Sequence, residues 1–292
     1  MAQLAHRRFT LVWILGLSVA ALAIALVMVV DTARSRPESA KPQAADTQAV
    51  DTQAADKGIG RALDRRVELP PDIPLVGGTL AVGADLPSAD HCVAHAEQVG
   101  SQREQIAENR EANLSVPASL TLPPWPDFWN DSANRLFVPR IDGKYAGTTD
   151  QIIVWGACKW GIDAEVVRAM AVAESSWRQD KVSDFATDPA LCVGGAAVPC
   201  PTSFGLLQLK HTTRPGSWPN SKQHTAFNVD YSLAVLRGCY EGWVNYLENG
   251  YTGGDLWGCV GWHYSGEWKD GLALKYIETV QHWLDVRPWT RW

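Results

Sequence analysis

The sequence predicts a mainly α protein with long loops. Apolar residues recur at helical spacing in several segments after residue 148, whereas the alternation of apolar and polar residues that is typical of strands is convincing nowhere. The helical segments also begin and end with the expected capping residues. The chain has 292 residues, which is enough to bury a sizeable core.

The first helix boundaries follow from local capping signals. A short helix is expected over 89–98, with Ser88 as its N-cap and Gly100 as its stop. Thr148 and Gln151 have the spacing of a capping box, which satisfies backbone donors at the start of a second helix.

The second helix is expected to end at Gly161, and Asp163 is expected to cap a third that stops near Trp177. Further helices are expected over 229–247 and 272–284, where large apolar residues recur at helical spacing. Long loops are expected at 180–225 and 248–270, and an irregular lead-in at 116–147.

An uninterrupted apolar run, residues 11–30, follows Arg7 and Arg8. As a helix it would reach about 30 Å, the thickness of the hydrocarbon core of a bilayer. The two arginines favour residues 1–10 in the cytoplasm and the rest of the chain outside. A cleaved signal peptide is the alternative, but its apolar region is usually shorter and ends in a small-x-small cleavage site, and VVDTARS is a poor one. We therefore expect an uncleaved transmembrane signal anchor and a protein of the cell envelope; secretion after signal cleavage is the alternative.

The segment after the anchor is expected to be a flexible linker, residues 31–87. Its part at 36–57 is a near-repeat of Ala, Asp, Thr and Gln without large apolar residues, so burial cannot offset the entropy of ordering it. The folded domain is expected at 88–292, with its core at about 148–292.

Charge and tryptophan content narrow the class of ligand. The net charge of −6, with 26 Lys and Arg against 32 Asp and Glu, argues against a nucleic-acid partner. The chain has 14 tryptophans, all but Trp13 after residue 120. Such a surplus is typical of a groove for a flat ligand such as a sugar, although a Trp-rich core has the same composition.

Six cysteines in an exported chain suggest disulfide bonds. No two of them are two to four residues apart and no histidine pair has finger spacing, so no metal site is expected. Six cysteines allow 15 connectivities. Locality favours Cys192–Cys200 and then Cys239–Cys259, which leaves Cys92–Cys158 by elimination.

Glu174 stands in the last turn of the expected third helix, on a stripe shared with Val167 and Met170. Burial and the negative end of the helix dipole both raise the pKa of a carboxyl placed there. A carboxyl that stays protonated near neutral pH is what a general acid for glycosidic cleavage requires. Taken alone, the position also fits an ordinary surface glutamate.

Four ordered segments change that balance. They are MAVAESSW at 170–177, SFGLLQL at 203–209, NVDYSLAVL at 228–236 and GCVGWHYSGEW at 258–268. In this order they resemble the lysozyme-like lytic transglycosylases (the superfamily of soluble lytic transglycosylases and goose-type lysozymes), which cut bacterial peptidoglycan. The likeness is greatest to exported actinobacterial members and extends from about Cys92 to the carboxyl end. It implies a lysozyme-like α domain behind the membrane anchor and linker.

The resemblance implies a reaction with one essential carboxyl, Glu174. It would protonate the oxygen between N-acetylmuramic acid (MurNAc) and N-acetylglucosamine (GlcNAc), while the N-acetyl oxygen of the substrate stabilises the anomeric centre. The ionised Glu174 would then take the proton of the muramyl C6 hydroxyl, which closes a 1,6-anhydro ring. The substrate is the peptidoglycan glycan strand, and no cofactor or metal is required.

Other residues of the matched segments are candidates for substrate binding. Ser175 would hold the acid or the N-acetyl group, and Gly205 would let the backbone approach the substrate closely. Gln208 would hydrogen-bond a sugar, and Tyr264 would hydrogen-bond Glu174 or the sugar. Trp262 and Trp268 would stack on the sugars. Each also has a purely structural interpretation as a helix cap, a turn residue or a core aromatic.

The chain departs from the family pattern in two places. The Tyr-Asn pair of the family is Tyr264-Ser265 here, so Ser265 or His263 would have to replace the asparagine. An insertion with Cys192 and Cys200 separates Glu174 from the later motifs. His211 and His224 show no partner spacing, and neither receives a role.

Two other functions also fit the sequence. A hydrolysing muramidase on the same fold would need a second carboxylate, for which Asp184 and Glu267 are the best candidates. A non-catalytic glycan-binding module of the cell wall is the alternative from another class, although a pure binder has no need for an acid flanked by apolar residues.

Overall fold

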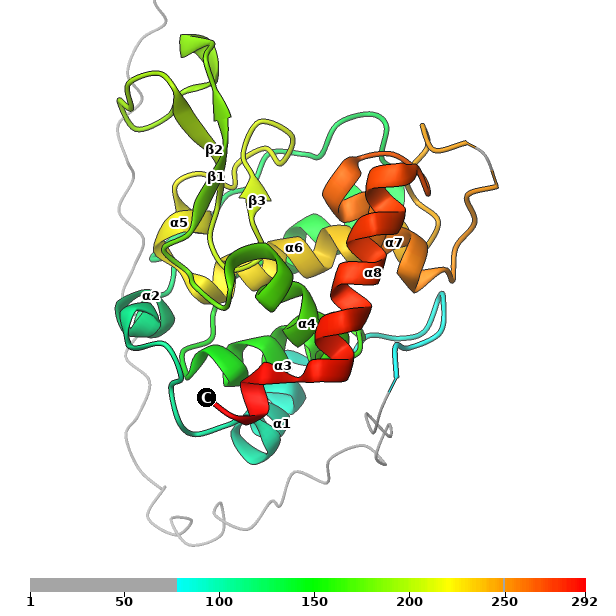
Figure 1. Cartoon of the computed structure of the whole chain (residues 1–292). Coiled ribbons are helices and arrows are strands. Elements are labelled where there is room, and N and C mark those ends of the chain that lie inside the picture. The colour runs from blue at the N-terminus through cyan, green and yellow to red at the C-terminus, as the bar shows by residue number, and fades with distance from the viewer. Residues whose placement is uncertain (1–77, 249) are drawn as a thin grey trace, which may run out of the picture. The chain divides into compact units, whose positions relative to one another are not determined.

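The part of the chain that the structure describes is mainly helical with one small sheet, and the sequence predicts the mainly α class (Figure 1). The structure is a computed structural model, and it describes residues 78–248 and 250–292. The α-helices in chain order are α1 (Ala89–Val99), α2 (Arg110–Leu114), α3 (Thr149–Trp160), α4 (Ala164–Ser175), α5 (Asn220–Gln223), α6 (Thr225–Tyr240), α7 (Leu256–Ser265) and α8 (Gly271–Val286). The strands β1 (Val182–Ala186), β2 (Cys200–Phe204) and β3 (Leu209–Lys210) form one antiparallel sheet in that order.

The expected anchor at 11–30 and the low-complexity segment at 36–57 lie outside the described residues. Among the helices that are described, none combines the length and the apolar character needed to cross a membrane. The last residues of the expected linker, 78–87, lie against the helical domain. Leu80 N donates to the carbonyl of Gly161 at 2.9 Å, so this segment is held by specific backbone contacts.

The capping signals act where the sequence places them. The Ser88 side chain caps α1, and Thr148 and Gln151 form both hydrogen bonds of a capping box at the start of α3. Gly161 ends α3 with a φ of 59°, which favours glycine. The Asp163 side chain then accepts from the backbone of the first turn of α4.

Two predictions of secondary structure were wrong, namely the bounds of the helix expected over 229–247 and the absence of regular structure in two expected loops. The helix expected over 229–247 is α6, which begins at Thr225 and ends at Tyr240, because the chain turns back through Gly242 with a φ of 84°. The long loops expected at 180–225 and 248–270 contain the three strands and α7. These strands are at most five residues long, too short to show a clear alternation of apolar and polar residues.

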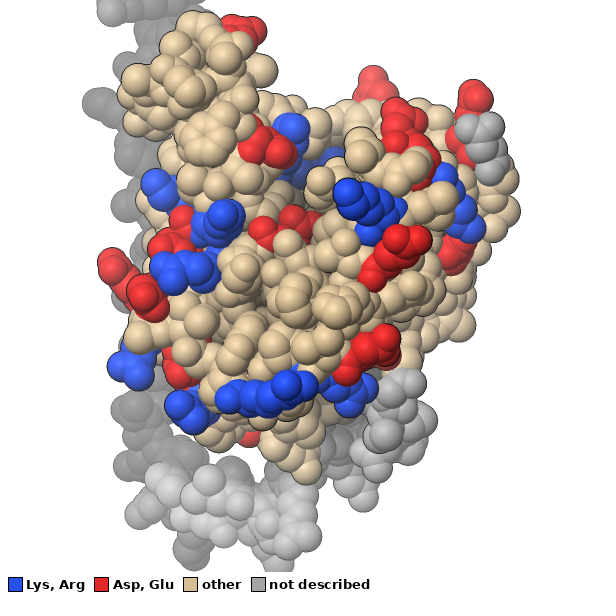
Figure 2. Space-filling model, in the orientation of Figure 1, with Lys and Arg blue, Asp and Glu red and all other residues tan. Residues whose placement is uncertain are grey.

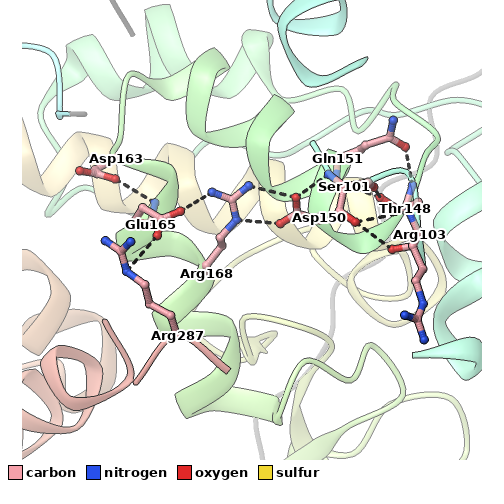
Figure 3. Close-up of polar contacts among 9 residues, drawn as sticks. All are labelled: Ser101, Arg103, Thr148, Asp150, Gln151, Asp163, Glu165, Arg168 and Arg287. Carbon is pink, nitrogen blue, oxygen red and sulfur yellow. Dashed lines mark hydrogen bonds and ion pairs between the residues drawn. The ribbon is translucent and has the colours of Figure 1, made fainter. Parts of the chain in front are cut away.

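An ion-pair network fixes the base of α4, the helix that carries Glu174 (Figure 3). The Asp150 carboxylate of α3 accepts from Arg168 of α4 through Nε at 2.7 Å and Nη2 at 3.0 Å. Arg168 also pairs with Glu165 one turn earlier, and Glu165 pairs with Arg287 beyond α8. Three segments are thereby tied together, and the two-bond contact of Arg168 with Asp150 sets the orientation of α4 on α3.

Three disulfide bonds join the cysteines of the domain, the two pairs that locality favours and the third that was left by elimination. Cys192–Cys200 closes the loop of the β1–β2 hairpin, and Cys239–Cys259 joins the end of α6 to α7. Cys92–Cys158 joins α1 to α3 across 66 residues. Disulfides persist in oxidising compartments, so they indicate an extracytoplasmic domain.

We expect the Cys92–Cys158 bond to contribute most to stability, because it closes the longest loop. The variant Cys92→Ser/Cys158→Ser should lose about 4 kcal/mol of unfolding free energy, and Cys192→Ser/Cys200→Ser about 2.5 kcal/mol. Urea unfolding followed by tryptophan fluorescence measures both. Equal losses, or a larger loss for the hairpin bond, would contradict this account.

Candidate active site

A groove of about 790 Å³ opens on one face of the domain. Figure 2 shows this face hollowed between the part built on the sheet, at the upper left, and the part built on α7 and α8, at the right, with acidic side chains inside the hollow. The lining side chains come from the end of α4, the sheet, the segment 208–215, the loop between α6 and α7, and the end of α7. They include Glu174, Asp184, Gln208, Lys210, His211, Arg214, Tyr246, Trp262, His263 and Tyr264.

Glu174 reaches this groove from the end of α4. The helix stops one residue later, because Ser176 and Trp177 both have positive φ values, 53° and 68°. The Glu174 side chain is 9% exposed. The carboxyl is thus largely removed from water yet lines an open groove, the arrangement expected of a proton donor.

Two neighbouring side chains converge on the same oxygen of Glu174. Tyr276 of α8 donates its hydroxyl proton to Oε1 at 2.5 Å, and Nε2 of His263 lies 3.5 Å from that atom. In the part of the chain that the structure describes, no protein group bonds Oε2. The transferable proton of Glu174 therefore belongs on Oε2.

Burial controls the protonation of this group. It raises the pKa of Glu174 to about 7, with a further rise from the charge of Asp184, whereas the hydrogen bond from Tyr276 opposes the rise. Burial and the nearby positive charge of Arg214 lower the pKa of His263 to about 4. At neutral pH the site thus combines a partly protonated carboxyl with an uncharged imidazole.

Tyr264 lines the groove, but the hydrogen bond proposed for it is made by Tyr276. The two rings stack with centroids 4.7 Å apart and planes 6° apart. Burial raises the pKa of Tyr276 well above its ordinary value, so its hydroxyl remains a donor to Glu174. Tyr264 therefore supports the ring that holds the acid.

The Gly-Leu-Leu-Gln turn brings Gln208 to the groove and leaves Gly205 outside its lining. The Gln208 side chain accepts from Ser183 at 2.6 Å and donates to the Gly205 carbonyl at 2.6 Å, so it is already engaged with the protein. Gly205 has a φ of 83°, and a Cβ there would lie 2.4 Å from Asn228 Nδ2. The glycine is required by the close approach of Asn228.

The remaining substrate-binding candidates are more buried. The Ser175 hydroxyl donates to the Ala171 carbonyl at 3.0 Å and accepts from the backbone of Arg178, a contact that ends α4. Trp262 lines the groove but is 1% exposed, and its indole N–H donates to Tyr246 at 2.7 Å. Trp268 lies outside the groove and lines a smaller cavity.

The other candidate carboxylates and histidines differ in whether they lie near Glu174. Asp184 lines the groove, accepts from Ser203 at 2.7 Å and pairs with Lys210 at 3.3 Å. Glu267 belongs to the smaller cavity beside Trp268. The His211 imidazole contacts the Leu191 carbonyl and that of His224 contacts Ser115, so neither reaches Glu174.

Tyr276 and Arg214 are the site residues that the sequence did not indicate, and His263 was considered only as a replacement for the asparagine of the family. Tyr276 falls on the apolar stripe of α8 with Ala273 and Val280, so its sequence position is that of a core residue. The signal available was its hydroxyl, since a buried tyrosine usually finds a hydrogen-bond partner.

We expect the Glu174 carboxyl to titrate near pH 7 in the free protein. Carbon-13 NMR of the glutamate side chains should show one resonance moving in this range, and Glu174→Gln should remove it. Tyr276→Phe should move the midpoint to higher pH, since the lost hydrogen bond favours the carboxylate. A Glu174 midpoint near 4.5 in the unsubstituted protein would contradict the assignment.

Comparisons with known proteins assign no family to this geometry. No protein-family model, curated protein or solved structure matches the chain. Within residues 78–248 and 250–292, no group of three or more His, Cys, Asp or Glu side chains is placed to hold a metal ion. In the groove, a buried carboxyl of raised pKa faces open space among aromatic and hydroxyl side chains.

Proposed function

We propose that this chain is a peptidoglycan lytic transglycosylase with a lysozyme-like α domain. The observation that carries the proposal is Glu174, a buried carboxyl with a pKa of about 7 and one oxygen without a protein partner in the described chain. The order of the four sequence segments supplies the substrate class, the β-1,4-linked glycan strand of MurNAc and GlcNAc.

The first chemical step is protonation of the glycosidic oxygen by Glu174. Oε2 carries the proton and Oε1 accepts from Tyr276, so the donor oxygen is the one left for substrate. Cleavage leaves positive charge at C1 of MurNAc, which the substrate's own N-acetyl oxygen stabilises. This step leaves GlcNAc with a new hydroxyl and Glu174 as a carboxylate.

The second step uses that carboxylate as a base. Tyr276 and the uncharged His263 both lie against Oε1, where they stabilise the developing anion. Glu174 takes the proton of the MurNAc C6 hydroxyl as its oxygen attacks C1, and the 1,6-anhydro ring closes. Because the nucleophile is part of the same sugar, the step benefits from a high effective concentration, and Glu174 ends protonated again.

A hydrolysing muramidase is the second candidate, and Asp184 is the observation that favours it. This carboxylate lines the same groove and raises the pKa of Glu174 through its charge. In a hydrolase it would activate a water or stabilise C1. The pairing of Asp184 with Lys210 and Ser203 in the sheet favours the alternative in which Asp184 only tunes Glu174.

Glu174→Gln should lower the rate of glycan cleavage at least about 100-fold, since Gln keeps the shape and loses the transferable proton. Glu267→Gln is the matched control, because Glu267 lies outside the groove. Mass spectrometry of fragments released from purified peptidoglycan should find 1,6-anhydro-MurNAc ends.

Reducing ends would show the hydrolase instead, and they should then disappear in Asp184→Asn. Binding of glycan without any cleavage would leave the non-catalytic binding module. Near-normal turnover by Glu174→Gln, with an unchanged near-ultraviolet circular dichroism spectrum, would overturn the assignment of the acid.

We also propose that residues 11–30 hold the protein in the cytoplasmic membrane with the domain outside. The three disulfides support an extracytoplasmic domain, and the apolar run is long enough to span. Cell fractionation should recover the full-length chain with the membrane, and amino-terminal sequencing should start before residue 11. A soluble form that begins after residue 30 would show a cleaved signal.

A further inference from the structure

Arg214 is a cation of the groove that has no role in the reaction proposed above. Its guanidinium carbon lies 5.4 Å from the ring centroid of Trp262, and both side chains line the groove with Glu174. Its charge also contributes to the lowered pKa of His263, whose imidazole is 3.5 Å from Glu174. Arg214 is therefore placed close to the point of cleavage.

The guanidinium is held in place but left without a counter-ion. A guanidinium has five N–H donors, and one of them, on Nη1, bonds the carbonyl of Thr213 at 3.2 Å. Across the described residues no Asp or Glu forms an ion pair with Arg214. Arg214 is half-buried, and this burial lowers the pKa of its guanidinium.

Hydrogen bonds hold the residues that surround Arg214. The carbonyl of Pro215, the next residue, accepts from Tyr231 of α6 at 3.0 Å. Trp262, beneath the guanidinium, donates to Tyr246 at 2.7 Å, and the Tyr246 hydroxyl donates to Gly266 at 2.8 Å. A preorganised arginine loses little entropy when a ligand pairs with it.

The other positive charges along the groove are already compensated or absent. Lys210 is paired with Asp184 at 3.3 Å, and both are about half exposed. Burial lowers the pKa values of His211 and His263, so these imidazoles are uncharged at neutral pH. Within the described groove, an anionic group of a ligand would thus bind most favourably at Arg214.

We propose that Arg214 binds a carboxylate of the peptide stem that MurNAc carries, so that the enzyme prefers strands whose stems have free carboxylates to strands whose stem carboxylates are amidated. This rests on the proposed function, because it takes the glycan strand as substrate. The sugar backbone of that substrate is uncharged, whereas the stem ends in free carboxylates and hangs from the same MurNAc whose C1 bond is cleaved. Guanidinium and carboxylate match in charge and in two-bond geometry.

The test compares two substrates with the full-length chain. They are soluble glycan strands with intact peptide stems and the same strands after the stem carboxylates have been converted to carboxamides, which leaves the sugars unchanged. We expect the unsubstituted protein to show a kcat/KM about 10- to 100-fold higher on the strands with free stem carboxylates. In Arg214→Gln this ratio should fall close to one, and in Arg214→Lys it should be intermediate because the charge stays and the fork is lost.

Lys210→Gln is the matched control, since it removes a positive charge from the same groove that is already paired and half exposed. Its ratio should stay within about threefold of the unsubstituted protein. A ratio in Arg214→Gln equal to that of the unsubstituted protein would overturn the proposal. Unchanged thermal unfolding of Arg214→Gln separates loss of recognition from loss of fold.

A binding measurement keeps this proposal distinct from the proposed function. Calorimetry would compare a soluble disaccharide tetrapeptide with the same compound after its carboxylates have been converted to carboxamides. We expect at least about tenfold weaker binding of the amide form, and no such difference in Arg214→Gln. Arg214-dependent binding without cleavage would support Arg214 and refute the enzyme, whereas cleavage without any stem preference would do the reverse.

Discussion

The domain is organised around the polar side chains of α6, a helix that is buried at every residue and crosses the middle of the domain (Figure 1). A buried polar group is costly unless it is hydrogen-bonded, and three of these side chains, Asn228, Asp230 and Arg237, bond to neighbouring segments. Asp230 accepts from Lys159 and Trp160 of α3 at 2.8 and 2.7 Å. Arg237 donates to the carbonyls of Leu80 and other backbone groups at the start of the described chain. Satisfying α6 therefore fixes what surrounds it.

The same constraint reaches the candidate active site through Asn228, one turn into α6. Its side chain donates to the Phe204 carbonyl at 2.8 Å and accepts from Leu207 N at 2.8 Å, which clamps both sides of the Gly205 turn. That turn in turn places Gln208 at the groove. The Asn-starting helix and the Gly-Leu-Leu-Gln turn are thus one structural unit, and their joint appearance in the sequence has a physical reason.

Features set by local chemistry were predictable from the sequence, and features set by distant contacts were not. The capping box of Thr148 and Gln151 depends on residues three apart, so its pattern is legible in the chain. The end of α6 at Tyr240 depends on the return of the chain through Gly242 and on the bond of Cys239 to α7, neither of which changes the apolar periodicity beyond it. The short strands depend on pairing across the hairpin, which periodicity cannot register.

The candidate site divides in the same way. Glu174 was indicated by its place at a helix end within a motif, and the structure gives it the burial that the helix stripe implied. Its partners Tyr276 and His263 come from helices about ninety to one hundred residues later, and their meeting with Glu174 depends on how α8 packs on α4. No spacing rule links residues so far apart. The expected partner of Glu174 was therefore Tyr264, which belongs to the matched segment 258–268, whereas Tyr276 lies outside it.

The raised pKa of Glu174 also means that its burial destabilises the folded state at neutral pH. Its pKa is about 7 when folded against an ordinary 4.5, so the protonated form is the one that folding favours. Below about pH 4.5 Glu174 is protonated in both the folded and the unfolded chain, so its ionisation does not change the free energy of unfolding. Between about pH 4.5 and 7 the free energy of unfolding falls as pH rises, because only the unfolded chain gains from losing the proton. Above about pH 7 this loss amounts to about 3 kcal/mol, a large part of the net stability of a typical domain. The disulfides and the hydrogen-bonded side chains of Asn228, Asp230 and Arg237 in α6 offset a cost of this size, and they allow the Glu174 carboxyl to remain buried.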